Sequence, residues 1–398
     1  MAKNNSLRPA FRALALIVAA GVGGATLAPA GACAQGVPSN VSSNVSGPQV
    51  PATPQSTASA TGTEAETVTA SSSERLRDTA QLVVSERLRT YALARGLARG
   101  EGAIGTARDL KALLAAQGYY MEGAGFTLLE AEQGVYPALA YVPNMNGGSE
   151  NDQLVIQGYV FRLREDLVAR GGAAFGLSYD GRVRLGWAQG HYLEARAELG
   201  VLYAPEPDLT RTVGQISLCA RNQLVNWNFL DLCYSHIEVR RDLADQAQDD
   251  VELAFSHLFE VGRNRHEVGF ALGHSTYGDL DQTHATISLD SVGGRVATRL
   301  SLDLAEPLIY GATGTDLALR AEVRWLAAGH VVGLGLQASQ SARSTFFGER
   351  RQDQGLGVTA LYQIKDNLVL SVGVSQVKSS VDFFDQHAIQ FNISTKLR

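Results

Sequence analysis

Apolar and polar side chains alternate with a period of two through the larger, carboxyl-terminal part of the chain. Between Leu193 and Tyr203 every odd position is apolar, whereas Glu194, Arg196 and Glu198 carry charges. Successive side chains of a strand point to opposite faces, so this pattern predicts strands with one apolar face and one charged face. The same separation recurs at residues 296–304, 317–325 and 389–393. We therefore expect residues 151–398 to be almost entirely strands.

The connections between these expected strands alternate in length. Short turns are expected at residues 225–227, 262–265, 291–294, 327–329 and 365–367, and longer connections at 204–211, 240–249, 305–315, 340–354 and 378–385. Outer-membrane barrels have short periplasmic turns and long external loops. We predict an all-β membrane protein, an antiparallel transmembrane β-barrel of about 14 strands (about 12 to 16). Its first strand is expected near residue 153, and its first hairpin turns at either Asp180-Gly181 or Gln189-Gly190.

Composition excludes two other classes of protein. Beyond the amino terminus no apolar run approaches the roughly 18 residues that a membrane-spanning helix needs, and the mean hydropathy is −0.05. A barrel strand keeps its apolar residues at alternate positions and is hydrophilic on average. The formal net charge of −6 gives no bulk attraction to nucleic acid, so we expect no nucleic-acid partner.

The amino-terminal part divides into three segments. Residues 1–34 have the basic start, the apolar core and the Ala32 and Ala34 cleavage residues of a secretory signal peptide. Residues 35–73 are rich in Ser, Thr, Pro and Ala and are expected to be a disordered tether. Residues 74–150 are expected to be a short helical periplasmic segment, because apolar residues recur at helical spacing around residues 76–92 and 110–114. We expect two short helices, separated by the glycines at 100–105.

Charges of both signs lie on the polar parity of the expected strands. An arginine facing lipid near the membrane midplane would cost about 2 to 4 kcal/mol, so this parity must face the lumen. These charges either pair across neighbouring strands or guide a charged solute or chain, and both interpretations stay open. The predicted lumen-lining residues are Glu194, Arg196, Glu198, Arg221, Asp231, Arg295, Arg299, Asp303, Arg320, Glu322 and Arg324.

Cys219 and Cys233 lie symmetrically about Asn226, the middle of an expected turn. The two residues therefore face each other across one hairpin, which predicts a disulfide in an exported protein. Two unpaired thiols are the alternative. Because the closed loop is short, we expect the disulfide to contribute at most about 3 kcal/mol and to fix the hairpin at the periplasmic rim.

We expect no catalytic, cofactor-binding or metal-binding residues, and no enzymatic activity. Barrel hydrolases place His and Ser two residues apart on one strand face, whereas His236, His257 and His274 are each adjacent to a serine and therefore lie on the opposite face. The segment 144–152 carries side-chain oxygens but not the regular ligand spacing of a calcium loop. It is better explained as a turn that leads into the first strand.

The signal, the short helical part and the strand pattern over residues 150–398 resemble Gram-negative outer-membrane β-barrels. The layout is similar to surface lipoprotein assembly modifiers and polysaccharide-export barrels, which implies passage of a polymer or polypeptide. We predict an outer-membrane channel or export conduit for a solute, polysaccharide or polypeptide. Its partners would be outer-membrane lipid and a periplasmic protein, with residues 74–130 gating the lumen or docking that protein, and both termini would be periplasmic. The alternative is a structural or adhesive barrel that acts through external loops such as 341–354, which carries Phe346 and Phe347.

Overall fold

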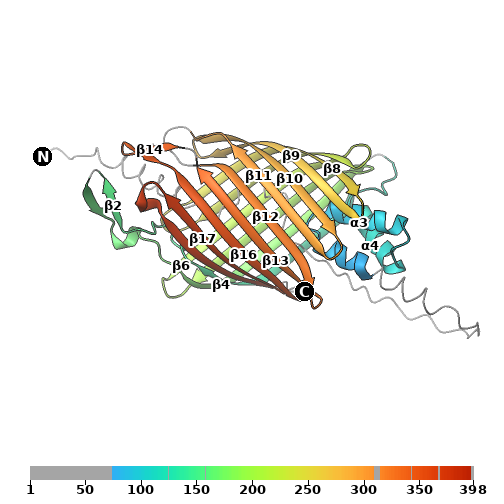
Figure 1. Ribbon diagram of the computed structural model, residues 1–398, viewed down its shortest axis with the longest axis horizontal. Coiled ribbons are helices and arrows are strands. Elements are labelled where there is room, and N and C mark those ends of the chain that lie inside the picture. The colour runs from blue at the N-terminus through green and yellow to red at the C-terminus, as the bar shows by residue number, and fades with distance from the viewer. Residues whose placement is uncertain are drawn as a thin grey trace, which may run out of the picture.

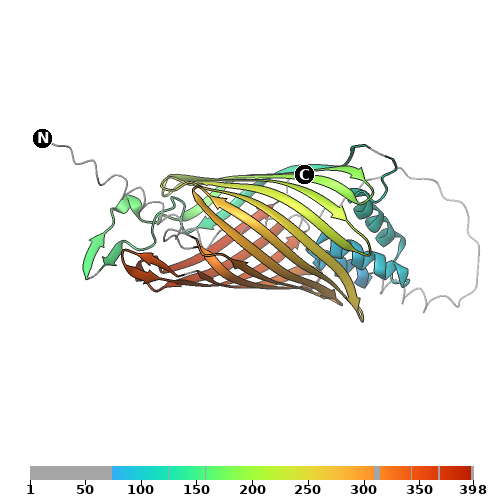
Figure 2. The ribbon, with the colours of Figure 1, turned by 90° about the horizontal axis from the view of Figure 1, so that it is seen from above.

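The computed structural model describes residues 74–123, 125–156, 158–308, 314–341, 343–365 and 368–395. Fourteen of the described strands form a closed antiparallel barrel, as Figures 1 and 2 show. The predicted fold class is therefore confirmed. The predicted signal peptide and tether lie outside the described residues. The barrel strands are β1 (Thr127–Val142), β4 (Gly172–Ala188), β5 (His191–Ala204), β6 (Leu209–Gln223), β7 (Asn228–Arg240), β8 (Gln246–Val261), β9 (Asn264–Tyr277), β10 (Leu280–Gly293), β11 (Val296–Ala305), β12 (Thr315–Ala327), β13 (His330–Ser341), β16 (Asp353–Lys365), β17 (Leu368–Ser379) and β18 (Gln386–Thr395).

The barrel closes through β1, a strand that the sequence pattern did not predict. β1 pairs with β18, where Tyr141 lies opposite Phe391, and with β4. The region expected to begin the barrel instead forms the hairpin of β2 (Gln153–Ile156) and β3 (Tyr159–Arg162), which pair only with each other. The predicted boundary between a helical segment 74–150 and a barrel 151–398 is therefore wrong. The inward residues Ala138 and Ala140 in the second half of β1 are small and apolar, so the contrast in polarity between its two faces is weak there.

The first hairpin turns at Gln189-Gly190, between β4 and β5. Asp180 and Gly181, the other predicted turn, lie inside the β1–β4 ladder, opposite Gly134 and Gln133. All connections at this end of the barrel are short, and we call it the turn end. The opposite end, the loop end, carries the longer connections, together with a two-residue turn between β9 and β10. The predicted long connection at 204–211 is wrong, because the β5–β6 ladder continues to the pair Ala204 and Leu209 and leaves only a four-residue turn.

The two faces of the strands differ as the alternation predicts. Outward residues such as Leu199, Ile216 and Leu319 are about half exposed, whereas the charged residues between them point inward. The barrel therefore has an apolar exterior, which suits lipid, and a polar interior.

Three helical stretches lie at the turn end, where two were expected. Residues 74–82 are helical, and they are followed by α3 (Glu86–Ala98) and α4 (Ile104–Ala116). We call residues 74–116 the helical plug. α3 begins after Ser85, whose side chain accepts a hydrogen bond from the Leu88 amide as an N-cap. No helix in the described part of the chain is long and apolar enough to span a membrane.

The plug buries apolar residues against the inner wall of the barrel at the turn end, where Figure 2 shows the helices. The cluster joins plug residues Leu82, Val83, Leu88, Tyr91 and Ala92 to strand residues Phe229, Leu258, Val292, Ala297 and Val331. These strand residues all lie near the turn ends of their strands. The plug therefore sits in the mouth of the lumen at the turn end.

The loops at the other end form a second apolar cluster. It combines the hairpin of β14 (Ser344–Phe346) and β15 (Glu349–Arg351), the short helix η4 (Asp382–Phe384), and Leu154 of β2. A further short helix, η3 (Glu165–Leu167), follows β3. Phe346, which the adhesive alternative placed on the surface, is buried in this cluster, whereas Phe347 is exposed. The apolar cluster explains the difference, because the β14–β15 hairpin folds back on η4.

Candidate functional site: the lumen and its helical plug

All but one of the predicted lumen-lining residues lie on inward positions of the barrel strands. Arg295 is the exception, because it belongs to the turn before β11 and its side chain is 68% exposed. The alternation of polar and apolar residues begins one residue before β11, so Arg295 was expected to face the lumen although it lies in the turn. Most of the inward charges pair with neighbours: Arg299 with Asp290 at 2.6 Å, Arg320 with Asp303 at 2.9 Å, Arg324 with Glu322, and Arg196 with Asp180 at 2.8 Å and Glu198 at 2.9 Å.

Arg184 is the centre of a buried ion network that holds the plug. Its Nη2 lies 2.6 Å from Glu86 Oε2 on α3 and 2.6 Å from Glu194 Oε2 on β5, and its Nη1 lies 3.2 Å from Glu130 Oε2 on β1. Arg182 Nη1 approaches the other oxygen of Glu86 at 2.8 Å. One carboxylate of the plug is thus held by two arginines of one strand.

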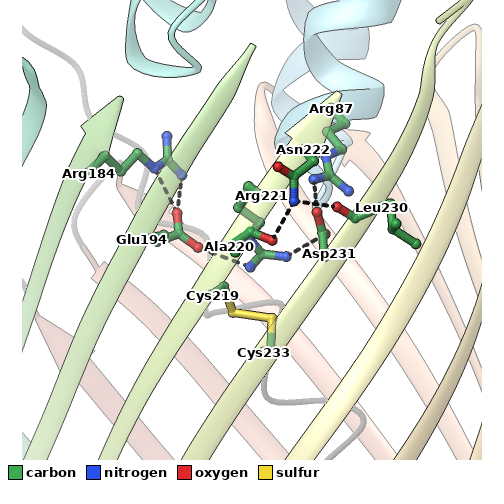
Figure 3. The surroundings of a disulfide bond; sticks show 10 residues. All are labelled: Arg87, Arg184, Glu194, Cys219, Ala220, Arg221, Asn222, Leu230, Asp231 and Cys233. Carbon is green, nitrogen blue, oxygen red and sulfur yellow. Dashed lines mark hydrogen bonds and ion pairs between the residues drawn. A yellow bond between two sulfur atoms is a disulfide. The ribbon is translucent and has the colours of Figure 1, made fainter. Parts of the chain in front are cut away.

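Arg87, the residue after Glu86 in α3, binds the other end of the network, on β7. Its Nη2 lies 2.6 Å from Asp231 Oδ1 on β7, and Asp231 Oδ2 is 2.8 Å from Arg221 Nη1. Arg221 Nη2 then reaches Glu194 Oε1 at 3.0 Å. Figure 3 shows this continuous line of ion pairs, which runs from Arg87 through β7, β6 and β5 to Arg184 on β4. Charge-assisted hydrogen bonds of this kind fix geometry strongly.

The electrostatics of α3 depend on its place in the barrel. Burial alone would raise the pKa of Glu86, but Arg184 and Arg182 outweigh burial and hold that pKa below its ordinary value. Burial opposes the charge of Arg87, yet Asp231 raises its pKa above the ordinary value. Both side chains are therefore charged at neutral pH when the plug is docked.

Other contacts attach the plug around the mouth. Ser85 Oγ donates to Glu267 of β9, and Thr79 Oγ1 donates to the Gly294 carbonyl at 2.7 Å. Arg95 Nε lies 3.1 Å from Glu260 Oε2 at the end of β8. These contacts run from β4 to the turn between β10 and β11, so the plug is not held by one wall alone.

The predicted disulfide between Cys219 and Cys233 is present and joins directly opposite residues of β6 and β7. Both residues lie on the lumen face, next to Arg221 and Asp231 (Figure 3). The disulfide therefore fixes the two strands that carry the Arg87 side of the ion network.

Replacing both cysteines by serine is expected to leave a folded barrel. Because the cysteines are 14 residues apart in sequence and the ladder already holds them together, the free energy of unfolding should fall by at most about 3 kcal/mol. Urea unfolding of the refolded variant measures this loss. A variant that forms no barrel under conditions that refold the natural chain would contradict the prediction.

The wall opposite the ion network is made of small, uncharged residues. A cavity of about 510 Å³ in the lumen is lined there by Gly333, Gly335, Gly357, Gly373 and Ser375 of β13, β16 and β17. The lining on the other side contains Arg221, Asp231, Arg299, Asp303, Arg320, Glu322 and Arg324. Small side chains leave space in the cross-section. Above the plug the lumen is therefore an open space with one charged wall and one neutral wall.

A group of lumen residues that sequence reasoning missed has catalytic residue types. Ser275 Oγ lies 3.4 Å from His284 Nδ1, and it donates to Asp250 Oδ1 at 2.6 Å. In a hydrolase the serine hydroxyl would be aligned on the imidazole, which takes its proton. Here the proton is directed to the aspartate, so this group is better suited to a structural hydrogen-bond network than to catalysis.

The described residues contain no group of three His, Cys, Asp or Glu side chains that could hold a metal ion. Segment 144–152 follows β1 and does not lead into the first barrel strand. Asn144 and Asn146 use their side chains to bond the backbone of this loop, for example from Asn144 Nδ2 to the Gly148 carbonyl at 2.7 Å. The segment is a folded turn at the loop end.

Comparisons with solved structures find barrel proteins at low identity. A BenF-like porin from Pseudomonas fluorescens is 9% identical with a TM-score of 0.38, over 67% of this chain and 99% of that chain. OprB from Pseudomonas putida is 9% identical with a TM-score of 0.37, over 69% of this chain and 94% of that chain. A KdgM porin is 13% identical with a TM-score of 0.28, over 47% of this chain and 97% of that chain.

No protein-family profile and no curated protein matches the chain. The resemblance to surface lipoprotein assembly modifiers and polysaccharide-export barrels stays a prediction. At these identities the similar structures say nothing about what the lumen carries or how the plug behaves.

Proposed function

We propose that the chain is an outer-membrane channel for small solutes, and that its own helical plug closes the turn end of the lumen. The observation that carries the proposal is the plug itself, docked by buried ion pairs inside a barrel that keeps a cavity of about 510 Å³ above it. A barrel built only as a surface scaffold needs no such cavity.

The apolar exterior supports placement in the outer membrane. Short turns face the periplasm in bacterial barrels, so the turn end and its plug are periplasmic in this proposal. In this proposal the first helical stretch, which bonds to Gly294 through Thr79, and the end of β18 both lie on the periplasmic side.

The interface between the plug and the barrel wall consists largely of ion pairs, which supports a plug that can be released. A buried ion pair is specific, but its desolvation cost offsets much of its attraction. The apolar part of the interface is confined to a few side chains. α4 adds an exposed surface, since Ile104 is 85% exposed and Thr106 is its one buried residue. A periplasmic partner that binds α4 would pull on the plug, and export of a polymer would need the same release.

Acidic pH is expected to open the channel. The docked pKa of Glu86 is lower than its ordinary value, so docking is favoured above about pH 4 to 5 and is lost as pH falls through the lowered value. Single-channel recording of the full chain between pH 7 and pH 3 should show rising conductance.

A Glu86→Gln variant is the matched control, because it lacks the titrating carboxylate. Its conductance should be higher at neutral pH and should change less with pH. A full chain that stays equally closed, or equally open, across the whole range would contradict the proposed role of Glu86.

One observation favours an adhesive function as the second candidate. The β2–β3 hairpin at the loop end leaves Tyr159, Val160 and Phe161 more than half exposed. Surface binding that is lost when residues 153–162 are deleted, in a barrel that conducts no ions even without its plug, would favour this candidate.

A further inference from the structure

Two arginines at the loop end differ from the arginines that hold the plug, because within the described residues the guanidinium group of neither one forms an ion pair with a carboxylate. Arg211 points inward from β6, and among the described residues no acidic side chain pairs with it; its buried Nε has no hydrogen-bond partner. Arg241 follows β7 directly and is only 9% exposed. Its Nε donates weakly to the Ala244 carbonyl at 3.3 Å, and its buried Nη2 donates to nothing.

Both arginines line one cavity of about 320 Å³ at the outer mouth of the lumen. Side-chain amides of Asn144, Gln390 and Asn392 line the same cavity. Within the described lining, Glu150 is the one carboxylate, and its Oε2 accepts a hydrogen bond from the His387 amide at 2.9 Å. Burial raises the pKa of Glu150, and neither arginine offsets that rise. Glu150 therefore does not neutralise the two arginines.

The surrounding loop holds Arg241 in place. Gly147, at a φ of 77°, packs against the guanidinium so closely that a Cβ there would lie 3.1 Å from Arg241 Nε. The Leu243 amide donates to the Asn146 carbonyl at 2.9 Å, which fixes the segment after Arg241. The two unused donors are thus part of a folded site.

Burial and the nearby charge of Arg211 lower the pKa of Arg241 to about 10, and Asp245, which accepts a hydrogen bond from the Arg241 backbone amide at 3.1 Å, offsets only part of this lowering. Arg241 is still charged at neutral pH, next to a second charged and unpaired arginine. Buried like charges with unfilled donors are unfavourable, and an anion would relieve this cost. The planar guanidinium matches a carboxylate or a phosphate group, and a cavity of this size lies at the lower end of small-molecule sites.

We propose that this cavity is a binding site for a small oxyanion, held between Arg211 and Arg241 at the outer mouth of the lumen. The use of the site in solute uptake rests on the proposed channel function, whereas the binding itself does not require conduction. The site would give the channel a preference for anionic solutes before they reach the charged wall below.

Isothermal titration calorimetry of the full chain in detergent, with succinate and with inorganic phosphate as separate probes, tests the proposal. We expect the natural chain to bind at least one of them. Arg211→Gln and Arg241→Gln should each weaken binding by about tenfold or more, the effect of losing one charge-assisted hydrogen bond. Arg211→Lys and Arg241→Lys, which keep the charge, should bind more tightly than the glutamine variants.

Arg343→Gln is the matched control, because Arg343 is exposed in a loop at the same end and does not line the cavity. Its affinity should equal that of the natural chain. A change in gel mobility on heating, which reports the folded barrel, shows that each variant is folded. Binding of succinate alone assigns the site to carboxylates, binding of phosphate alone assigns it to phosphates, and binding of both supports a general oxyanion site.

The proposal is overturned if neither probe binds the natural chain at tens of millimolar, or if the folded double variant Arg211→Gln, Arg241→Gln binds as tightly as the natural chain. Specific binding without any ion conductance would keep this site and contradict the channel function instead. The two proposals can therefore fail separately.

Discussion

Removing residues 74–116 is expected to raise the single-channel conductance of the barrel severalfold. The deletion takes away all three helical stretches but keeps residues 117–126, which lead into β1 at Thr127. The apolar cluster and the ion network both end at the inner wall of the barrel. Without the plug, the cavity above it opens directly to the turn end.

The barrel should survive this deletion, because the strand ladder closes without the plug. In the deletion variant Asp231 still pairs with Arg221, and Glu194 still pairs with Arg184 and Arg221. Few charged side chains of the barrel therefore lose all of their ion-pair partners. The folded fraction should be checked by heat-dependent gel mobility before recording. A folded deletion variant with the same conductance as the full chain would show that the helices do not close the lumen.

Replacing Arg184 by glutamine is expected to be the most damaging single change to plug docking. Arg184 is 4% exposed and contacts Glu86, Glu130 and Glu194. Breaking a buried ion pair typically costs about 3 to 5 kcal/mol. In this variant Glu86 still pairs with Arg182 and Glu194 still pairs with Arg221. We therefore expect the free energy of unfolding to fall by about 3 kcal/mol, the lower end of that range. Urea unfolding and single-channel recording should show a less stable barrel with higher conductance.

Arg196→Gln is the matched control for this prediction. Arg196 also faces the lumen and pairs with Asp180 and Glu198, but it does not contact the plug. Its replacement should lower stability without raising conductance. If Arg196→Gln opens the lumen as much as Arg184→Gln does, the effect belongs to the barrel wall and not to the plug.

The barrel was predictable because lipid imposes a strict polarity on strand faces. The alternation around Arg196 and Arg320, together with the alternation of turn lengths, predicted the fold class and most inward charges. The disulfide followed from the positions of Cys219 and Cys233 about one turn. β1 was not predicted, because Ala138 and Ala140 weaken the contrast in polarity between its two faces.

The plug contacts could not be predicted, since they join residues far apart in sequence. Glu86 and Arg184 are 98 residues apart, and no local pattern connects α3 with β4. Arg211 could have been found, because it shares the inward parity of Arg221. That signal was lost because residues 204–211 were expected to form a connection, whereas β6 begins at Leu209.

Solute entry into liposomes tests most directly whether this barrel is a channel that its own helices close. Liposomes carrying the full chain, or the chain without residues 74–116, would be placed in solutions of small neutral sugars, and swelling would be followed by light scattering. We expect rapid, size-limited swelling with the deletion variant and much slower swelling with the full chain. No swelling from a folded deletion variant would contradict this expectation.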